Sequence, residues 1–214
     1  PDYAAHTHSP FLLEGMDRAV VRVLSAIARN ERIAVYADFD CDGIPGAALL
    51  SDFFRKIGYG NFEVYLPHRD REGYGFHTSA IDTLKARGVS VIITIDVGTV
   101  AHEGLAHAKG LGIDVIVTDH HEVHGEKPLA YALVNPKIKP YPYPDLCGAA
   151  VAWKLVQALL IQGRKNKSDL STTSQTCFDR LRAIPEGWEK WLLDLVAIAT
   201  IADLVPLVGE NRAL

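Results

Sequence analysis

The stretch "IAVYADFDCDG", residues 33–43, joins a short apolar run to three aspartates. Asp38, Asp40 and Asp42 stand at alternate positions, directly after residues typical of a buried β-strand. Two carboxylates about 6 Å apart repel each other by roughly 3 kcal/mol at an effective dielectric constant of 20. The three aspartates must therefore point apart, take up protons or share a cation.

The same kind of apolar run recurs along the chain, with amphipathic stretches before and between the runs. Strands are predicted at residues 33–37, 62–66, 91–95, 113–118 and 131–134, and helices at about 14–29, 43–58, 78–88 and 100–111. The runs are β-branched and nearly continuous, as in strands that are buried on both faces. Because strands alternate with helices, we expect an α/β fold with a five-stranded, mainly parallel sheet flanked by helices.

The pattern becomes helical after residue 146. Helices are predicted at about 147–162 and 188–203, and the polar stretch between them, residues 162–176, is expected to form a surface loop. We expect residues 1–146 to form the α/β region and residues 147–214 to continue the same core with helices.

Composition sets wide bounds on function. The 214 residues are 48% hydrophobic and 22% charged, which is typical of a globular protein. The formal net charge of -4 does not favour a nucleic-acid partner, but two divalent cations would bring it to about zero, so charge alone decides nothing. The chain opens on Pro1 with no initiator Met, and we expect a segment of a longer protein.

Cysteine content and hydropathy bear on the compartment. The three cysteines form no Cys-x-x-Cys pair and are expected to be reduced thiols in a cytoplasmic protein. The longest apolar run, residues 192–208, contains Asp194 and Asp203 and is a poor candidate for a membrane span.

Ionisable residues follow three of the predicted strands. Asp38 follows the first strand, Asp96 the third, and the triplet Asp119-His120-His121 the fourth. Ligands of open parallel sheets bind outside the carboxyl ends of the strands, so these side chains are expected to meet at one edge. Carboxylates with histidine and no thiolate favour Mn²⁺ or Mg²⁺ over Zn²⁺.

A further acid, Asp203, lies near the end of the last predicted helix. A carboxylate in the last turn opposes the helix dipole, and its apolar surroundings favour a specific partner over simple exposure.

Four motifs in this order resemble those of the DHH phosphoesterase superfamily: "DFDCDG", "ITIDVGT", "VTDHHE" and "ATIADLVPL". Within the superfamily the chain is most similar to the RecJ group of single-strand-specific 5′→3′ exonucleases. Supporting stretches are "HRDREGYG", "VNPK" and "LCGAAVAWKL". The second motif commonly reads Asp-Asn-Gly in the superfamily, and Val97 replaces the amide here.

The resemblance implies a pair of Mn²⁺ or Mg²⁺ ions that hydrolyse phosphodiester bonds. The residues that it assigns to metal binding are Asp38, Asp40, Asp42, Asp96, His120 and Asp203. Asp38 would be a ligand or a close partner of one, and Asp96 would bridge both ions. His121 would face the scissile phosphate, with Asp96 and Asp38 as further catalytic residues, and Asp119 would orient a histidine.

Two segments are candidates for contact with the substrate. Gly148 and Ala149, at a predicted helix start, can offer free backbone N–H groups to a phosphate, although close helix packing explains the small residues equally well. Arg69, Arg71 and Tyr74 combine cations with an aromatic ring, as channels for single strands do, although the same residues suit a solvated loop.

The resemblance implies single-stranded DNA as partner, a monomer without membrane contact, a role in DNA repair and recombination, and contact with other repair proteins. Enzymes of the same superfamily that cleave oligoribonucleotides, cyclic dinucleotides or pyrophosphate are an alternative. A non-catalytic replication scaffold is a second alternative.

Overall fold

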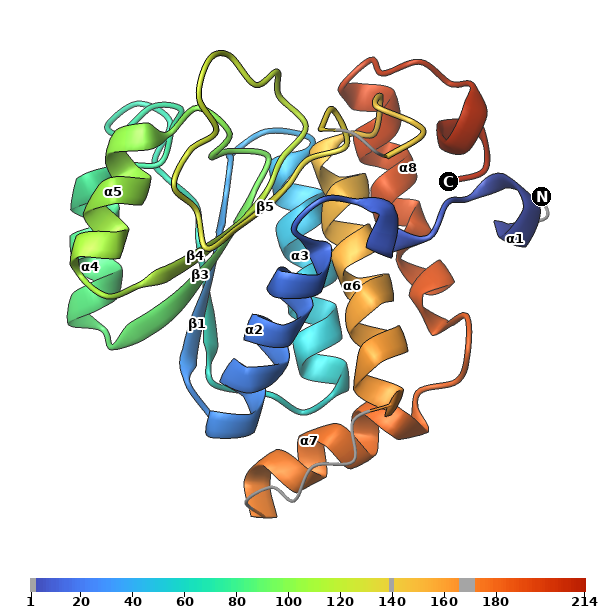
Figure 1. The fold of residues 1–214 in the computed structure, drawn as a ribbon, viewed down its shortest axis with the longest axis horizontal. Helices are drawn as coiled ribbons and strands as arrows, with labels where there is room; N and C mark the ends of the chain where they lie inside the picture. Colours follow the sequence, from blue (N-terminus) through green and yellow to red (C-terminus); the bar gives the residue numbers. More distant parts are fainter. Residues whose placement is uncertain (1–2, 139–140, 166–171) are drawn as a thin grey trace.

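The computed structural model describes residues 3–138, 141–165 and 172–214 (Figure 1). Its five strands are β1 (Arg32–Ala37), β2 (Phe62–Tyr65), β3 (Val89–Ile95), β4 (Asp114–Thr118) and β5 (Ala132–Val134). They form one sheet in the order β2-β1-β3-β4-β5, and every neighbouring pair is parallel. The predicted five-stranded α/β fold is confirmed, and the described sheet is parallel throughout.

Helices cover both faces of the sheet (Figure 1). On one face lie α2 (Met16–Arg29), α3 (Gly43–Lys56) and α6 (Gly148–Lys165), with α7 (Thr172–Ala183) and α8 (Leu193–Ala202) packed against them. On the other face lie α4 (Thr78–Ala86) and α5 (His102–Gly110). Four short elements complete the described chain: α1 (Tyr3–His6) and the 3₁₀ helices Pro10–Leu12, Trp188–Leu192 and Gly209–Arg212.

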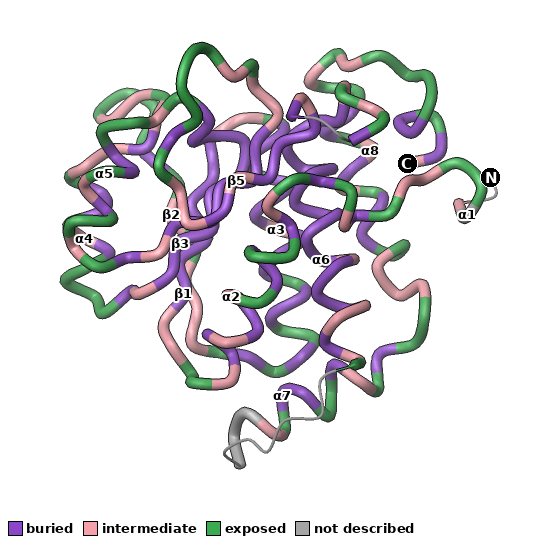
Figure 2. The backbone as a smooth tube through the Cα atoms, in the orientation of Figure 1, coloured by how far each residue is buried: buried purple, intermediate pink, exposed green. Residues whose placement is uncertain are grey.

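The strands alternate between two hydrophobic cores. In β1, Ile33 and Val35 belong to the core beneath α2, α3 and α6, while Ala34 and Tyr36 belong to the core beneath α4 and α5. This follows from the period of two along a strand, and it explains why the strand sequences are nearly continuous apolar runs. The strands β1, β3 and β4 are accordingly buried along most of their length, whereas the edge strand β2 has no fully buried residue (Figure 2).

The order of the strands fixes where a ligand can bind. The chain passes from β1 through α3 to β2 and then through α4 to β3, which pairs with the opposite side of β1. The strand order therefore reverses between β1 and β3, and a crevice opens at the carboxyl ends of the strands at such a point. Ala37 and Ile95, the last residues of β1 and β3, are direct partners in the sheet, so Asp38 and Asp96 begin their loops side by side.

The predicted surface loop at residues 162–176 is wrong at both ends. The helix α6 continues to Lys165 and α7 begins at Thr172, while residues 166–171 lie outside the described part of the chain. Phe178 and Leu181 of α7 are buried in the larger core, and Leu181 lies against Gly163 of α6. The sequence around residue 172 has too few apolar residues to reveal a helix, whose stability comes instead from packing.

A buried ion pair joins distant parts of the chain. The Nζ atom of Lys154 lies 2.5 Å from Oε1 of Glu210, and both side chains are fully buried. Lys154 also donates to the carbonyl oxygen of His8, and the hydroxyl of Tyr141 donates to Glu210. This network connects α6 with the segments around residues 8, 141 and 210.

No helix among the described residues combines the length and the hydropathy needed to cross a membrane.

Candidate metal centre

Four separate elements deliver acids and histidines to one edge of the sheet. Asp38 follows β1, Asp96 follows β3, the triplet 119–121 follows β4, and Asp203 ends α8. Their ligand atoms form three groups, in each of which the atoms lie within 4.8 Å of one another. The groups are Asp38–Asp40–Asp96, Asp42–His120–Asp203 and Asp96–His120–His121.

His120 lies between three carboxylates. Its Nε2 atom is 3.1 Å from Oδ1 of Asp96, 3.6 Å from Oδ2 of Asp42 and 3.7 Å from Oδ2 of Asp203. Burial lowers the pKa of His120, but its contact with Asp96 and the charges of Asp42 and Asp203 outweigh burial and raise the pKa above its usual value. The imidazole is thus the point at which the three acids converge.

Asp96 is held in an unusual backbone conformation. Its φ of 58° lies in the left-handed region, which costs most residues about 1–2 kcal/mol but which Asp and Asn tolerate best among residues with a side chain. Burial, together with the nearby Asp42, raises the pKa of Asp96 to about 7, although His120 opposes the shift. The carboxylate is 4% exposed, so it has lost most of its hydration.

Asp40 and Asp42 are tied to helix starts. Oδ1 of Asp40 accepts hydrogen bonds from the N–H groups of Asp42 and Gly43, which orders the turn into α3. Asp42 accepts from Gly148 at 2.5 Å and from Ala149 at 2.6 Å, at the start of α6. Two helix N-termini therefore stabilise the crowded carboxylates, in keeping with the positive end of the helix dipole.

The same contacts correct one expectation. For Gly148 and Ala149 the sequence left two explanations open, free N–H groups for a phosphate and close helix packing, and in this structure both N–H groups donate to Asp42. The first explanation is therefore wrong. Close approach explains Gly148 instead, because a Cβ atom there would lie 2.7 Å from Cβ of Asp96.

Asp119 contacts a histidine, in keeping with the role that the resemblance implied for it. Its Oδ1 atom lies 2.7 Å from Nδ1 of His121, and its Oδ2 atom accepts from the N–H of Thr99. Burial raises the pKa of Asp119, but the hydrogen bonds from His121 and Thr99 outweigh it and lower the pKa to about 2. The same bond to Asp119 raises the pKa of His121 to about 9, against the opposing effect of burial.

Asn135 and Thr99 support this pair and were not predicted from the sequence. The amide of Asn135 donates to Oγ1 of Thr99 and to the carbonyl oxygen of His121. Asn135 follows the last residue of β5 directly, so the strand-end rule that found Asp38, Asp96 and the triplet would have found it as well.

The cluster has the features expected of a divalent metal site. Oδ1 of Asp38 is buried and has no hydrogen-bond partner, and Oδ1 of Asp96 is buried with His120, at 3.1 Å from Nε2, beside it. Orphaned anionic oxygens in a buried site are costly unless a cation compensates them. Burial also raises the pKa values of Asp38, Asp42 and Asp203, as expected for anions crowded together without a counter-charge. A set of carboxylates with histidine fits Mn²⁺ or Mg²⁺.

The loop with the sequence "HRDREGYG" lies beside this cluster. The hydroxyl of Tyr74 donates to the carbonyl oxygen of Asp96 at 3.4 Å, and its ring lies 5.9 Å from that of His121. The guanidinium of Arg69 stacks over the ring of Phe39, within the aspartate motif, at 4.8 Å. Arg71 is exposed on the same turn. Tyr74 and Arg69 therefore reach the site, and Phe39 is a contact that the sequence did not reveal.

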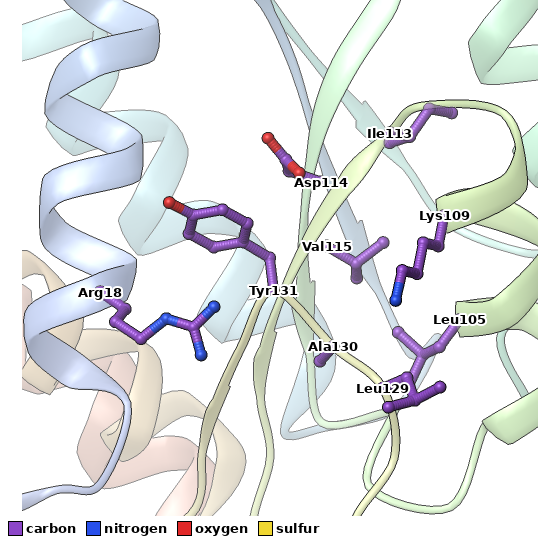
Figure 3. A pocket seen from close by; sticks show the side chains of 9 residues that line it. All are labelled: Arg18, Leu105, Lys109, Ile113, Asp114, Val115, Leu129, Ala130 and Tyr131. Atoms are coloured by element: carbon purple, nitrogen blue, oxygen red, sulfur yellow. The ribbon is translucent and has the colours of Figure 1, made fainter.

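A separate pocket of about 200 Å³ lies at the other end of the sheet (Figure 3). Arg18 of α2 stands on one side of it, 5.1 Å from the ring of Tyr131, and Lys109 of α5 stands on the other. Asp114, which begins β4, is among the lining residues, whereas the candidate metal ligands stand at the carboxyl ends of the strands. This pocket is therefore distinct from the metal centre.

The protein is of the doubly wound α/β class, with an acid and histidine cluster at the switch point of its sheet. The profile of the DHH family, N-terminal domain, matches residues 32–200. The chain belongs to the DHH family.

Its relatives include proteins named single-stranded-DNA-specific exonuclease RecJ. The chain is 40% identical over 205 residues to that of Escherichia coli and 39% identical over 211 residues to that of Bacillus subtilis. These alignments cover 94% and 97% of the chain but 34% and 23% of the two relatives, so the chain spans about a quarter to a third of their length.

Solved structures agree with this placement. An exonuclease RecJ bound to manganese matches with a TM-score of 0.79 and 29% identity, over 97% of this chain and 48% of that one. RecJ from Thermus thermophilus in complex with Mn²⁺ matches with a TM-score of 0.72 and 26% identity, over 94% of this chain and 26% of that one.

Proposed function

We propose that this chain is the catalytic core of a metal-dependent exonuclease that removes nucleotides from the 5′ end of single-stranded DNA. The observation that supports the proposal most is the gathering of five aspartates and two histidines at one edge of the sheet. The relatives named above, which carry the name of single-stranded-DNA-specific exonucleases, supply the substrate class.

The geometry favours two cations. Asp38, Asp40 and Asp96 would hold one ion, and Asp42, His120 and Asp203 would hold a second. Asp96 lies between the two sets, because its Oδ1 atom is also close to His120, and we assign it the bridging position. When bound, a pair of divalent ions lowers the pKa of water and neutralises charge on the phosphate and the leaving oxygen.

His121 is assigned to the substrate. Its Nδ1 atom is engaged by Asp119, and its side chain is 44% exposed, so the ring can meet a phosphate from the solvent side. The raised pKa keeps the imidazole protonated at neutral pH, and the cation can stabilise negative charge that develops on the phosphate. Asp119 accepts from Nδ1 and fixes the orientation of the ring.

The alternatives have less support. A scaffold with a decayed site would have lost some of these acids and histidines, and the presence of five aspartates and two histidines close together supports an enzyme instead. Family enzymes that cleave oligoribonucleotides, cyclic dinucleotides or pyrophosphate share the metal chemistry, but the relatives compared above carry the name of DNA exonucleases.

We further propose that the chain acts as a monomer in the cytoplasm, in DNA repair and recombination, alongside other repair proteins and without a membrane partner. Three free cysteines are consistent with a reducing compartment.

The direct test is digestion of single strands labelled at the 5′ or the 3′ end, with and without Mn²⁺. We expect early release of the 5′ label as a mononucleotide and a slowly shortening 3′-labelled strand. Asp203→Asn should abolish release, and Asp194→Asn, an exposed acid on the same helix, should leave it unchanged. Release from the 3′ end first, or faster turnover of a cyclic dinucleotide, would contradict the proposal.

A further inference from the structure

A second hollow opens beside the metal centre. It has a volume of about 320 Å³ and is lined by residues 74–76, 97–98 and 100–104. Val97 and Gly98 follow Asp96 directly, and Tyr74, at the opposite wall, contacts the carbonyl oxygen of Asp96. The hollow therefore begins where the candidate metal ligands end, and a molecule bound at the metals can extend into it.

The charge of the lining does not favour a phosphate as its occupant. The ten lining residues, all within the described part of the chain, include no Lys or Arg, and the one basic side chain among them, His102, stands next to the carboxylate of Glu103. The helix α5 begins here, but Glu103 in its first turn already complements the positive end of the helix dipole. A second anion would meet repulsion at this place, whereas an uncharged group would not.

The lining does suit a flat, uncharged ring. Tyr74 is 48% exposed and Val100 is 50% exposed, so an aromatic face and an aliphatic side chain are open to a ligand. Phe76 and Val97 form the floor from the smaller core. Base–aromatic stacking tolerates every base, because each base has a π-face.

We propose that this hollow, which we call the base pocket (residues 74–76, 97–98 and 100–104), receives the nucleobase of a nucleotide that flanks the scissile phosphate. The base stacks on Tyr74 while the phosphate lies at the acid and histidine cluster. The inference rests on the proposed function, because it assumes a nucleotide substrate. It adds a binding site formed by the segment before α4, the segment after β3 and the start of α5.

Substrates without bases test the pocket. A single strand whose first two nucleotides are abasic is compared with the intact strand in the presence of Mn²⁺. We expect kcat/KM to be about 10-fold higher for the intact strand, the size of one stacking interaction. Tyr74→Leu should bring that ratio close to 1, and Tyr74→Phe, which keeps the ring, should preserve it.

A second pair of variants separates the pocket from the tyrosine. Val100→Met lengthens a side chain in the lining and should also reduce the ratio. Ala106→Met, at an exposed position of α5 outside the lining, should leave the ratio unchanged.

A binding measurement makes the result independent of cleavage. With Ca²⁺ in place of Mn²⁺, the fluorescence of 2-aminopurine at the first or second position should be quenched by the wild type and by Tyr74→Phe, and not by Tyr74→Leu. Equal cleavage of both strands without quenching would overturn the base pocket and leave the exonuclease standing. Cleavage of neither strand would overturn the proposed function, and the fluorescence would then decide on the pocket by itself.

Discussion

Asp96 combines three costs in one residue: a left-handed backbone, a carboxylate buried close to other acids, and a pKa raised to about 7. No packing contact explains all three. A cation shared between the two halves of the cluster does, because it favours the charged form of the buried carboxylate. The strain is therefore interpreted as part of the metal site.

Replacement of Asp96 should separate these costs. Asp96→Asn keeps a side chain that tolerates the left-handed region and removes the buried charge, so its melting temperature without divalent ions should equal or exceed that of the wild type. A ligand at 100 times its dissociation constant stabilises the fold by about 2.7 kcal/mol, so Mn²⁺ should raise the wild-type melting temperature and barely move the variant. Asp96→Ala should also fail to respond to Mn²⁺. It should be less stable than Asp96→Asn by about 1 kcal/mol, because alanine tolerates the left-handed region less well, and should therefore melt at a lower temperature. Thermal unfolding with and without Mn²⁺ measures this, and an equal response of all three proteins would contradict a shared site.

The two adjacent histidines should differ in what they bind. Nε2 of His120 faces three carboxylates, whereas Nδ1 of His121 is occupied by Asp119. We therefore expect His121→Ala to keep nearly the wild-type affinity for Mn²⁺ and to lose at least 100-fold in turnover, the effect of losing one electrostatic contact to the transition state. His120→Ala should lose both. Titration calorimetry and steady-state kinetics separate the two properties, and loss of a metal from His121→Ala would refute the distinction.

At the scale of elements, the sequence predicted all five strands and most helices, because strands buried on both faces have a clear apolar pattern. It also predicted that acids and histidines from three strand ends meet at one edge, since the parallel arrangement brings carboxyl ends together. It failed where neighbours in space decide the outcome. The α7 helix depends on contacts of Phe178 and Leu181, and the donors at Gly148 and Ala149 are occupied by an acid 106 residues away. The division of the chain at residue 146 stays a prediction.

The start of α6 should be sensitive to a single methyl group. A Cβ atom at Gly148 would lie 2.7 Å from Cβ of Asp96, closer than real Cβ contacts, so Gly148→Ala should displace α6 or Asp96. Both displacements weaken the metal centre, and we expect a lower melting temperature and a smaller rise with Mn²⁺. At Gly110, the last residue of α5, a Cβ atom meets nothing within 4 Å, so Gly110→Ala serves as the control and should be neutral or slightly stabilising. Identical behaviour of the two variants would rule out the close approach.

At the opposite end of the sheet, Arg22 joins α2 to the strands. It lies 2.6 Å from both Glu31 and Asp114, and Ser90 also donates to Glu31. Burial raises the pKa of Glu31, but the hydrogen bonds from Arg22 and Ser90 outweigh burial, so the pKa lies below its usual value of 4.5. A lowered folded-state pKa contributes stability above the unfolded pKa and loses it as the pH falls through the folded pKa.

Glu31→Gln should therefore be less stable than the wild type from pH 6 to 8 by a constant amount. The difference should shrink as the pH falls below about 4.5, where the carboxylate of the unfolded chain takes up its proton, and should be lost once the pH passes the lower pKa of the folded state. Urea unfolding at a series of pH values tests this. A difference that persists unchanged at pH 3 would show that the ion pair is not its source.

At the scale of the whole molecule, the balance of charged residues limits the affinity that we expect of the chain for DNA. It has 22 Lys and Arg against 26 Asp and Glu. Affinity for single strands grows with the number of phosphates neutralised, and each contact steepens the salt dependence by about 0.7. A chain that touches two or three phosphates near the metals should bind weakly, with a shallow salt slope, and should cut short oligonucleotides about as well as long ones.

This prediction of weak binding is tested by measuring dissociation constants over a salt series with Ca²⁺. The strands compared have about 6 and about 30 nucleotides. We expect similar dissociation constants for the two lengths. The logarithm of the association constant should fall with the logarithm of the salt concentration with a slope of about -2. Tight and steeply salt-dependent binding of the longer strand by the 214-residue chain would contradict it.

The dispersal of the ligands along the sequence also orders events during synthesis. Asp203 follows Asp40 by 163 residues, and at about 5–20 residues per second a ribosome needs roughly 8–30 s to add them. The three aspartates after β1 thus leave the ribosome long before His120, and Asp203 arrives last. The nascent chain must shield these acids with water and transient counter-ions, so the metal pair can consolidate the finished fold but cannot nucleate it.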